Sequence, residues 1–161
     1  MDQRHLDHSE RTSRDHPPVE AEVNGSDVLI VALAPGIEEW HCGRPLMPIK
    51  KRGGTAGRRI KLSWDRECKE RSQYDIIEAV QCYPGSGDHG HDKTPCADAV
   101  AACRGRLRAA LEQGNYRKAI ALGDVACQSL SAASADLRLE TVKATHPTGG
   151  ATNAELDGLW D

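Results

Sequence analysis

Residues 97–133 constrain the fold of this chain more than any other stretch of its sequence. Apolar residues recur there at three- and four-residue steps, at Val100, Cys103, Leu107 and Leu111. This spacing places them on one face of a helix. Gly114-Asn115 interrupts the pattern with residues that readily turn a chain, and a similar pattern resumes from Tyr116 to Leu130. Two helices joined by so short a break are expected to fold back on each other as an antiparallel hairpin.

Gln113-Gly114-Asn115-Tyr116 spans the break, and Ala119-Ile120 and Ala126 follow it. This order resembles the turn and second helix of a single tetratricopeptide repeat. The resemblance implies that the small residues lie where the two helices approach each other most closely. No second copy occurs at a spacing of about 34 residues, so the hairpin is not expected to stack into a solenoid.

The composition limits the size of the core. The chain has 161 residues, of which 39% are hydrophobic, and it contains no Phe. We therefore expect one small domain whose core depends on Leu, Ile, Val and Trp. No apolar run approaches the roughly 20 residues needed to cross a membrane, and the polar N-terminus lacks the apolar segment of a secretory signal. The six Cys are then expected to be thiols of an intracellular protein, cytoplasmic or nuclear.

Several short segments are candidates for a sheet. Val28–Leu33 is an apolar, β-branched run ended by Pro35-Gly36, which predicts a buried strand. Arg59–Trp64 alternates basic and apolar residues, as a strand with one cationic and one apolar face would. Tyr74–Cys82 is either a further strand or a short helix. Leu137–Val142 alternates apolar and charged residues, which favours an exposed strand over a helix.

These segments predict an α+β fold in which a small sheet carries the helical hairpin on one face. The domain is expected to span residues 25–145, after a disordered acidic arm at residues 1–24. Residues 146–161 are expected to form a flexible tail, although Leu156, Leu159 and Trp160 could dock on the body. Because only one face of the sheet would be covered, its other face must be polar or meet a partner.

Positive charge is concentrated in one segment. Residues 41–71 hold ten Lys and Arg against three Asp and Glu, and the sequence on both sides is acidic. Clustered cations gain affinity for nucleic acid by releasing counterions from its phosphates, and a flanking Trp could stack on bases. The predicted nucleic-acid-binding residues are Arg44, Lys50, Lys51, Arg52, Arg58, Arg59, Lys61 and Trp64. The alternative is a solvated basic loop with no ligand.

A second group of residues has the chemistry of metal ligands. Cys82, His89, His91 and Cys96 surround a Gly-rich loop and could hold a structural zinc ion. Their spacing lacks the paired CxxC motifs of established zinc sites, so packed Cys and unmetallated His are the alternative. Otherwise no cofactor is expected.

No catalytic motif is recognisable in the sequence: neither a P-loop nor a GxSxG elbow occurs. We therefore expect a non-enzymatic regulatory module whose basic segment, residues 44–71, contacts nucleic acid or another polyanion. The first alternative is a protein-interaction adaptor that uses the hairpin through Tyr116, Ile120 and Leu130. The second is a zinc-binding protein, and no membrane partner is expected.

Overall fold

The computed structural model describes residues 16–87 and 91–161. The elements follow in the order β1 (Val28–Ala32), α2 (Ile37–Cys42), α3 (Ala56–Arg66), β2 (Asp75–Glu78), α4 (Ala97–Gln113), β3 (Lys118–Leu122), α5 (Asp124–Ser134), β4 (Glu140–Ala144) and α6 (Asn153–Asp157). A 3-10 helix, Arg71–Gln73, precedes β2. None of the helices in these two ranges is long and apolar enough to cross a membrane.

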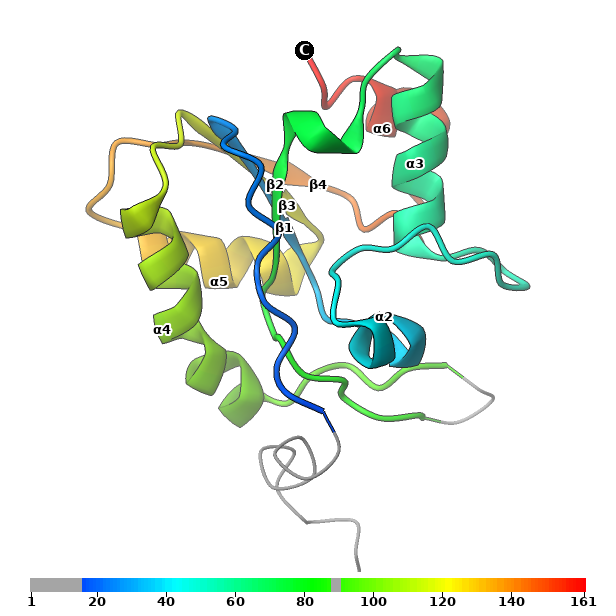
Figure 1. Ribbon diagram of the computed structural model, residues 1–161, viewed down its shortest axis with the longest axis horizontal. Coiled ribbons are helices and arrows are strands. Elements are labelled where there is room, and N and C mark those ends of the chain that lie inside the picture. Colours follow the sequence, from blue (N-terminus) through cyan, green and yellow to red (C-terminus); the bar gives the residue numbers. More distant parts are fainter. Residues whose placement is uncertain (1–15, 88–90) are drawn as a thin grey trace, which may run out of the picture.

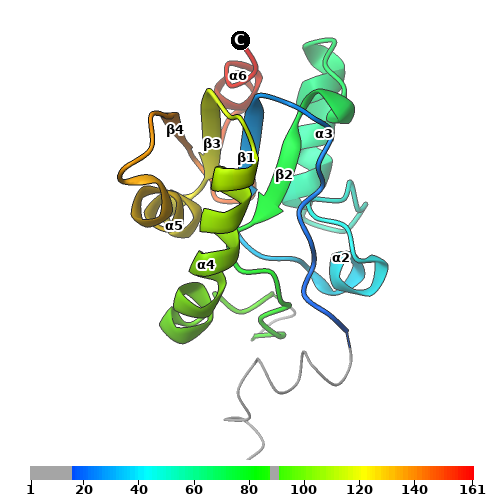
Figure 2. The same ribbon diagram turned by 60° about the vertical axis from the view of Figure 1, so that its left-hand side comes forward.

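The four strands form one parallel sheet in the order β2-β1-β3-β4. In the centre of the sheet, Ile30 of β1 lies opposite Ile76 of β2 and Ile120 of β3. Parallel neighbours require crossover connections, and these place helices on both faces (Figures 1 and 2). Every residue of β1, β2 and β3 is accordingly buried.

Each face of the sheet has its own apolar core. Helices α3 and α6 cover one face, where Ile60, Trp64 and Leu156 pack with Ile30. Helices α4 and α5 cover the other face, where their core residues Leu107, Leu111 and Leu130 pack with Leu29 and Val31. The expected combination of a small sheet with helices is therefore confirmed, but the expectation that only one face is covered is wrong.

The predicted helical hairpin is wrong, because a strand lies between its two helices. Lys118–Leu122 forms β3, which pairs with β1 on one side and β4 on the other. Its small apolar residues fit the crowded centre of the sheet as well as they fit a helix face. Gly123 then adopts a φ of 95° and turns the chain from β3 into α5.

The strand expected at Arg59–Trp64 is part of α3. Thr55 caps this helix, and its Oγ1 accepts a hydrogen bond from the Arg58 N–H at 3.2 Å. Ile60 and Trp64 are four residues apart and share the buried face of the helix, whereas Leu62 is 38% exposed. A strand would have put all three side chains on one face.

Both ends of the described chain pack on this body. Val19 is buried against Trp40 and Tyr83, within the segment expected to be a disordered arm. In place of the expected flexible tail, α6 docks beside α3, and the Trp160 Nε1–H donates to Ser63 Oγ at 2.8 Å. Lys118 Nζ donates to the carbonyl oxygens of Leu159 and Asp161. Residues 1–15 lie outside the described part of the chain.

Candidate functional site

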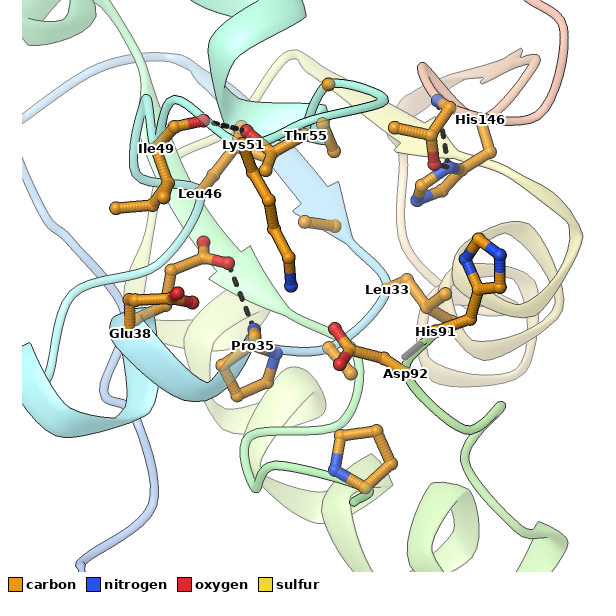
Figure 3. A pocket seen from close by; sticks show the side chains of 18 of the residues that line it. Leu33, Pro35, Glu38, Leu46, Ile49, Lys51, Thr55, His91, Asp92 and His146 are labelled. Atoms are coloured by element: carbon orange, nitrogen blue, oxygen red, sulfur yellow. Dashed lines mark hydrogen bonds between the residues drawn. The ribbon is translucent and has the colours of Figure 1, made fainter. Parts of the chain in front are cut away.

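The strand order places a pocket where parallel sheets bind their ligands. The chain leaves β1 toward β2 and leaves β3 toward β4, in opposite directions, so a crevice opens at the carboxyl ends of β1 and β3. A pocket of about 580 Å³ lies there. The pocket is lined by residues 32–36 at the end of β1 and beyond it, by Glu78 of β2, by Leu122 of β3 and by His146 after β4. Loops 51–54 and 91–94 complete its walls (Figure 3).

Glu39 holds two of the pocket walls together. Its Oε1 accepts a hydrogen bond from the Gly36 N–H at 3.0 Å, and its Oε2 accepts one from the Met47 N–H at 2.8 Å. Burial raises the pKa of this carboxyl group, although the two backbone donors oppose the shift. Since both oxygens are occupied by backbone groups, Glu39 supports the site and is not free to act on a ligand.

Glu78 is the most deeply buried acid of the pocket. It ends β2 and is 2% exposed, and its Oε1 accepts a hydrogen bond from the Leu46 N–H at 3.2 Å. Its Oε2 has no hydrogen-bond partner among the described residues. Burial, and next the nearby charge of Glu39, raise the pKa of Glu78 well above its usual value. Burial and the neighbouring acid therefore both favour the neutral form of Glu78.

Asp92 supplies a carboxylate at the mouth of the pocket. Its side chain is directed into the pocket from the 91–94 loop, on the side toward which Lys51 extends (Figure 3). The Tyr83 hydroxyl donates to Asp92 Oδ1 at 3.3 Å and also lies 2.8 Å from Ser86 Oγ. Asp92 Oδ2 faces Gly36, where a Cβ atom would lie 3.6 Å from it. The carboxylate is thus positioned by neighbours on its own loop and remains open to a ligand.

His146 contributes a hydrogen-bond donor from the segment that follows β4. Its Nδ1 accepts the Thr148 backbone N–H at 3.2 Å, so the proton of the neutral ring belongs to Nε2. Burial lowers the pKa of this imidazole, which keeps the ring neutral at pH 7. The arrangement offers an uncharged N–H donor to any acceptor that enters the pocket.

The structure divides the predicted basic segment into two groups. Lys50, Lys51 and Arg52 lie exposed on the loop that borders the pocket, and Lys51 and Arg52 line it. Within the described ranges, no ion pair joins these three residues to a carboxylate. Arg58 follows on the first turn of α3.

The other predicted cations have structural partners. Arg44 pairs with Glu22 at 2.6 Å and Lys61 with Asp65 at 2.8 Å. Arg59 donates to the carbonyl oxygens of Pro147 and Ala151 and so supports the segment that carries His146. Trp64 stacks on Tyr74 with 5.3 Å between ring centroids and is 3% exposed, so it cannot stack on a base.

The remaining predicted site residues do not gather into a site. Ile120 and Leu130 are buried in the core, and the Tyr116 hydroxyl donates to Asp75. Cys82 is half-buried, Cys96 caps α4, and His91 lines the pocket, while His89 lies outside the described residues. In the described part of the chain, no three His, Cys, Asp or Glu side chains are grouped to hold a metal ion.

The residues that make this pocket were missed as a group by sequence reasoning. Glu78 lies inside an apolar run, and His146 opens the segment that was expected to be a tail. A usable signal existed in their position. Glu78 lies within the candidate strand Tyr74–Cys82 and His146 follows the candidate strand Leu137–Val142, and the carboxyl ends of parallel strands meet at one edge of a sheet.

A comparison with known protein families identifies the superfamily of this chain. A family model described as the Uracil DNA glycosylase superfamily matches residues 20–160, whereas no curated protein matches the chain. The match includes residues 97–133, so the resemblance to a tetratricopeptide repeat is wrong. Members of this superfamily are DNA glycosylases, so the expectations of a non-enzymatic regulatory module, an adaptor or a zinc protein are also wrong. They bind DNA and generally need no cofactor, which agrees with the expected nucleic-acid partner. Since the match covers most of its length, the chain belongs to the Uracil DNA glycosylase superfamily.

Proposed function

We propose that this protein removes uracil from DNA by hydrolysing the N-glycosidic bond between the base and its deoxyribose. The observation that carries the proposal is the pairing, in one pocket, of a neutral His146 donor with the Asp92 carboxylate. Family membership supplies the class of substrate. The pocket, of about 580 Å³, is large enough to receive one nucleotide turned out of the base stack.

His146 has the hydrogen-bond donor needed to stabilise the negative charge that develops on the departing base. As the glycosidic bond breaks, negative charge develops on the carbonyl oxygens of uracil. A neutral Nε2–H donor stabilises that charge, and its effect is large in a site from which water is excluded. The Thr148 backbone N–H donates to Nδ1, and Thr148 Oγ1 lies 3.0 Å from the same nitrogen, so the tautomer with its proton on Nε2 satisfies the backbone donor.

Asp92 has the charge needed to stabilise the positive charge that develops on the sugar. Glycosidic hydrolysis passes through an oxocarbenium-like transition state, whose positive charge is stabilised by a nearby carboxylate. Asp92 also orients a water molecule for attack on C1′. The bond from C1′ to the base breaks, a bond from C1′ to the water oxygen forms, and the base leaves with a proton. Glu39 is unsuited to this role because two backbone groups occupy its oxygens.

The loop beside the pocket is suited to the DNA backbone. Lys50, Lys51 and Arg52 are exposed at the pocket rim and Arg58 follows on α3, so we propose that these four cations contact phosphates next to the extruded nucleotide. Arg44, Arg59 and Lys61 are not part of this proposal, because each already has a partner within the chain.

The test is release of uracil from a single-stranded oligonucleotide, detected as alkali-labile strand cleavage at the resulting abasic site. The wild-type chain should cleave a uracil-containing strand, and Asp92→Asn should reduce kcat by about 10²–10⁴-fold. Arg138→Glu is the matched control, because Arg138 is exposed in the α5–β4 connection at the other end of the sheet. Absence of uracil release by the folded wild-type protein would refute the proposed function. Full activity of Asp92→Asn would refute the role of this carboxylate.

A further inference from the structure

Lys51 places a primary amine in the pocket, and this amine takes no part in the bond changes described above (Figure 3). Among the described residues, no hydrogen bond or ion pair engages its Nζ atom. Other lysines of the chain are committed: Lys61 donates to Asp65, and Lys118 donates to two backbone carbonyl oxygens. The amine of Lys51 is therefore open to a ligand that enters the pocket.

Two hydrogen bonds fix the backbone from which this side chain extends. The Gly54 N–H donates to the Lys51 carbonyl oxygen at 2.9 Å and closes a four-residue turn. The third residue of this turn, Gly53, has a φ of 84°, which such a position requires. Thr55 Oγ1 donates to the Ile49 carbonyl oxygen at 2.7 Å and closes the base of the loop. The backbone of Lys51 is thus held at the rim, and its flexible stem reaches inward.

The amine lies on the side of the pocket where the sugar is expected. Lys51 extends toward the side that Asp92 enters from its own loop (Figure 3). In the proposed function Asp92 acts at C1′, so the amine of Lys51 faces the same carbon. Once the base has left, C1′ is a hemiacetal carbon, and its open-chain form is an aldehyde. Lysine amines condense with carbonyl groups of this kind to form Schiff bases.

We propose that this protein has a second activity, cleavage of the DNA strand at the abasic site, in which Lys51 is the nucleophile. This inference rests on the proposed function for the position of C1′ and adds a lyase reaction in the same pocket. The substrate is an abasic deoxyribose that carries a phosphate at its 3′ oxygen. Holding the amine beside the aldehyde makes the condensation effectively unimolecular, which is the advantage of the pocket over free lysine.

The reaction balances without any oxidant or reductant. The unprotonated amine of Lys51 attacks C1′, a C1′–N bond forms, and the aldehyde oxygen leaves as water. The resulting iminium ion draws electrons from C2′, whose proton passes to the Asp92 carboxylate. A double bond forms between C2′ and C3′ as the C3′–O bond breaks, and the phosphate leaves with the electron pair of that bond. Water then hydrolyses the imine and restores the amine of Lys51.

The test supplies the abasic strand directly, so it does not depend on uracil release. A single-stranded oligonucleotide with one abasic site, made by acid depurination, is incubated with the full chain and sodium cyanoborohydride, which reduces the imine to a stable amine. The wild type should form a covalent protein–DNA adduct, and peptide mass spectrometry should locate it on Lys51. Without the reductant, the wild type should cleave this strand in the absence of alkali.

Lys51→Arg separates the nucleophile from a contact with phosphate, because arginine keeps the positive charge but does not form an imine. This variant should lose the adduct and the strand cleavage. The adduct yield is divided by the fraction of abasic strand bound, so weaker binding cannot imitate the loss of the nucleophile. Lys93→Arg is the matched control, because Lys93 also lines the pocket, and this variant should keep the adduct. An adduct that persists in Lys51→Arg, or that maps to another amine, would overturn the proposal.

The two activities can fail separately. Uracil release by the wild type without any adduct on the abasic strand would overturn the role of Lys51 and leave the glycosylase intact. An adduct on Lys51 without release of uracil would support the lyase and overturn the glycosylase. If neither is observed, both proposals are overturned.

Discussion

Thr148 donates its backbone N–H to Nδ1 of His146, with 3.2 Å between the two nitrogen atoms. The two residues belong to the turn that follows β4, whose Ala144 accepts a hydrogen bond from the Gly123 N–H. Backbone geometry thus determines which nitrogen of the ring carries the proton. Thr148 Oγ1 also lies 3.0 Å from Nδ1, but a hydroxyl group can rotate, whereas the backbone donor moves only with the turn itself.

The first prediction concerns His146. His146→Ala should reduce kcat for uracil release by about 10²–10³-fold, because it removes the donor to the departing base. Since burial lowers the pKa of His146, wild-type activity should persist below the ordinary histidine pKa of 6.5 and fall only as the ring becomes charged at lower pH. The pH profile of kcat checks this, and an acid limb near or above 6.5 would contradict it.

The lowered pKa of His146 also makes the free energy of unfolding depend on pH. The folded state binds the His146 proton less readily than the unfolded chain does, so the stability associated with the neutral ring is present above pH 6.5. It is lost as the pH falls from 6.5 through the lower pKa of the folded state. Urea denaturation of the wild type and His146→Ala should show a smaller acid loss in the variant.

The second prediction concerns Glu39. Glu39→Ala should lower the free energy of unfolding by about 2–4 kcal/mol, because the N–H groups of Gly36 and Met47 lose their acceptor. Urea denaturation measures the change. Glu38→Ala is the control, because Glu38 is exposed and adjacent, and it should change stability by less than about 0.5 kcal/mol. Equal stability of the two variants would mean that Glu39 does not hold the pocket walls together.

The strands differ in how well they could be predicted from sequence. Val28–Leu33 is a continuous apolar run rich in β-branched residues, which is typical of strands buried on both faces, and the structure has β1 at Val28–Ala32. Lys118–Leu122 has the same environment, but its alanines suit a helix equally well. Hydrophobic periodicity could not distinguish a strand from a helix at residues 118–122, because what decides is the position of β3 between β1 and β4 in the sheet.

The site was harder to predict because its residues are distant in sequence. Neither Asp92 nor His146 was among the predicted site residues, and Glu78 stood in an apolar run. No local pattern connects them, and a parallel sheet brings them to one edge. The cationic loop was visible as a charge cluster, but only the structure separates exposed Lys51 from Arg59, which is committed to backbone carbonyls.

The third prediction concerns the basic loop. Replacing Lys50, Lys51 and Arg52 with Glu should weaken binding to single-stranded DNA and make it less sensitive to salt. If each of the three neutralises one phosphate, the slope of log K against log salt should decrease in magnitude by about 2. Fluorescence anisotropy at several salt concentrations measures the slope. Arg138→Glu should leave this slope unchanged. An unchanged slope in the triple variant would mean that the DNA does not contact this loop.

The fourth prediction concerns Gly57, where α3 passes close to the chain that carries Leu46 and Met47. A methyl group at position 57 would overlap the Met47 carbonyl, and that backbone is already held by Glu39 and Glu78. Gly57→Ala should therefore destabilise the protein by about 1–3 kcal/mol, although alanine is the better helix former.

Gly105 provides the matched control for this fourth prediction. It lies in the interior of α4, where an added Cβ would meet nothing within 4 Å. Gly105→Ala should stabilise the protein by about 0.5–1 kcal/mol through helix propensity alone. The two substitutions are chemically identical and both lie within helices, so opposite signs in urea denaturation isolate the contact with Met47. A gain in stability for Gly57→Ala would show that the 46–47 segment yields, and then Leu46 would not hold Glu78 Oε1 at a fixed place in the pocket.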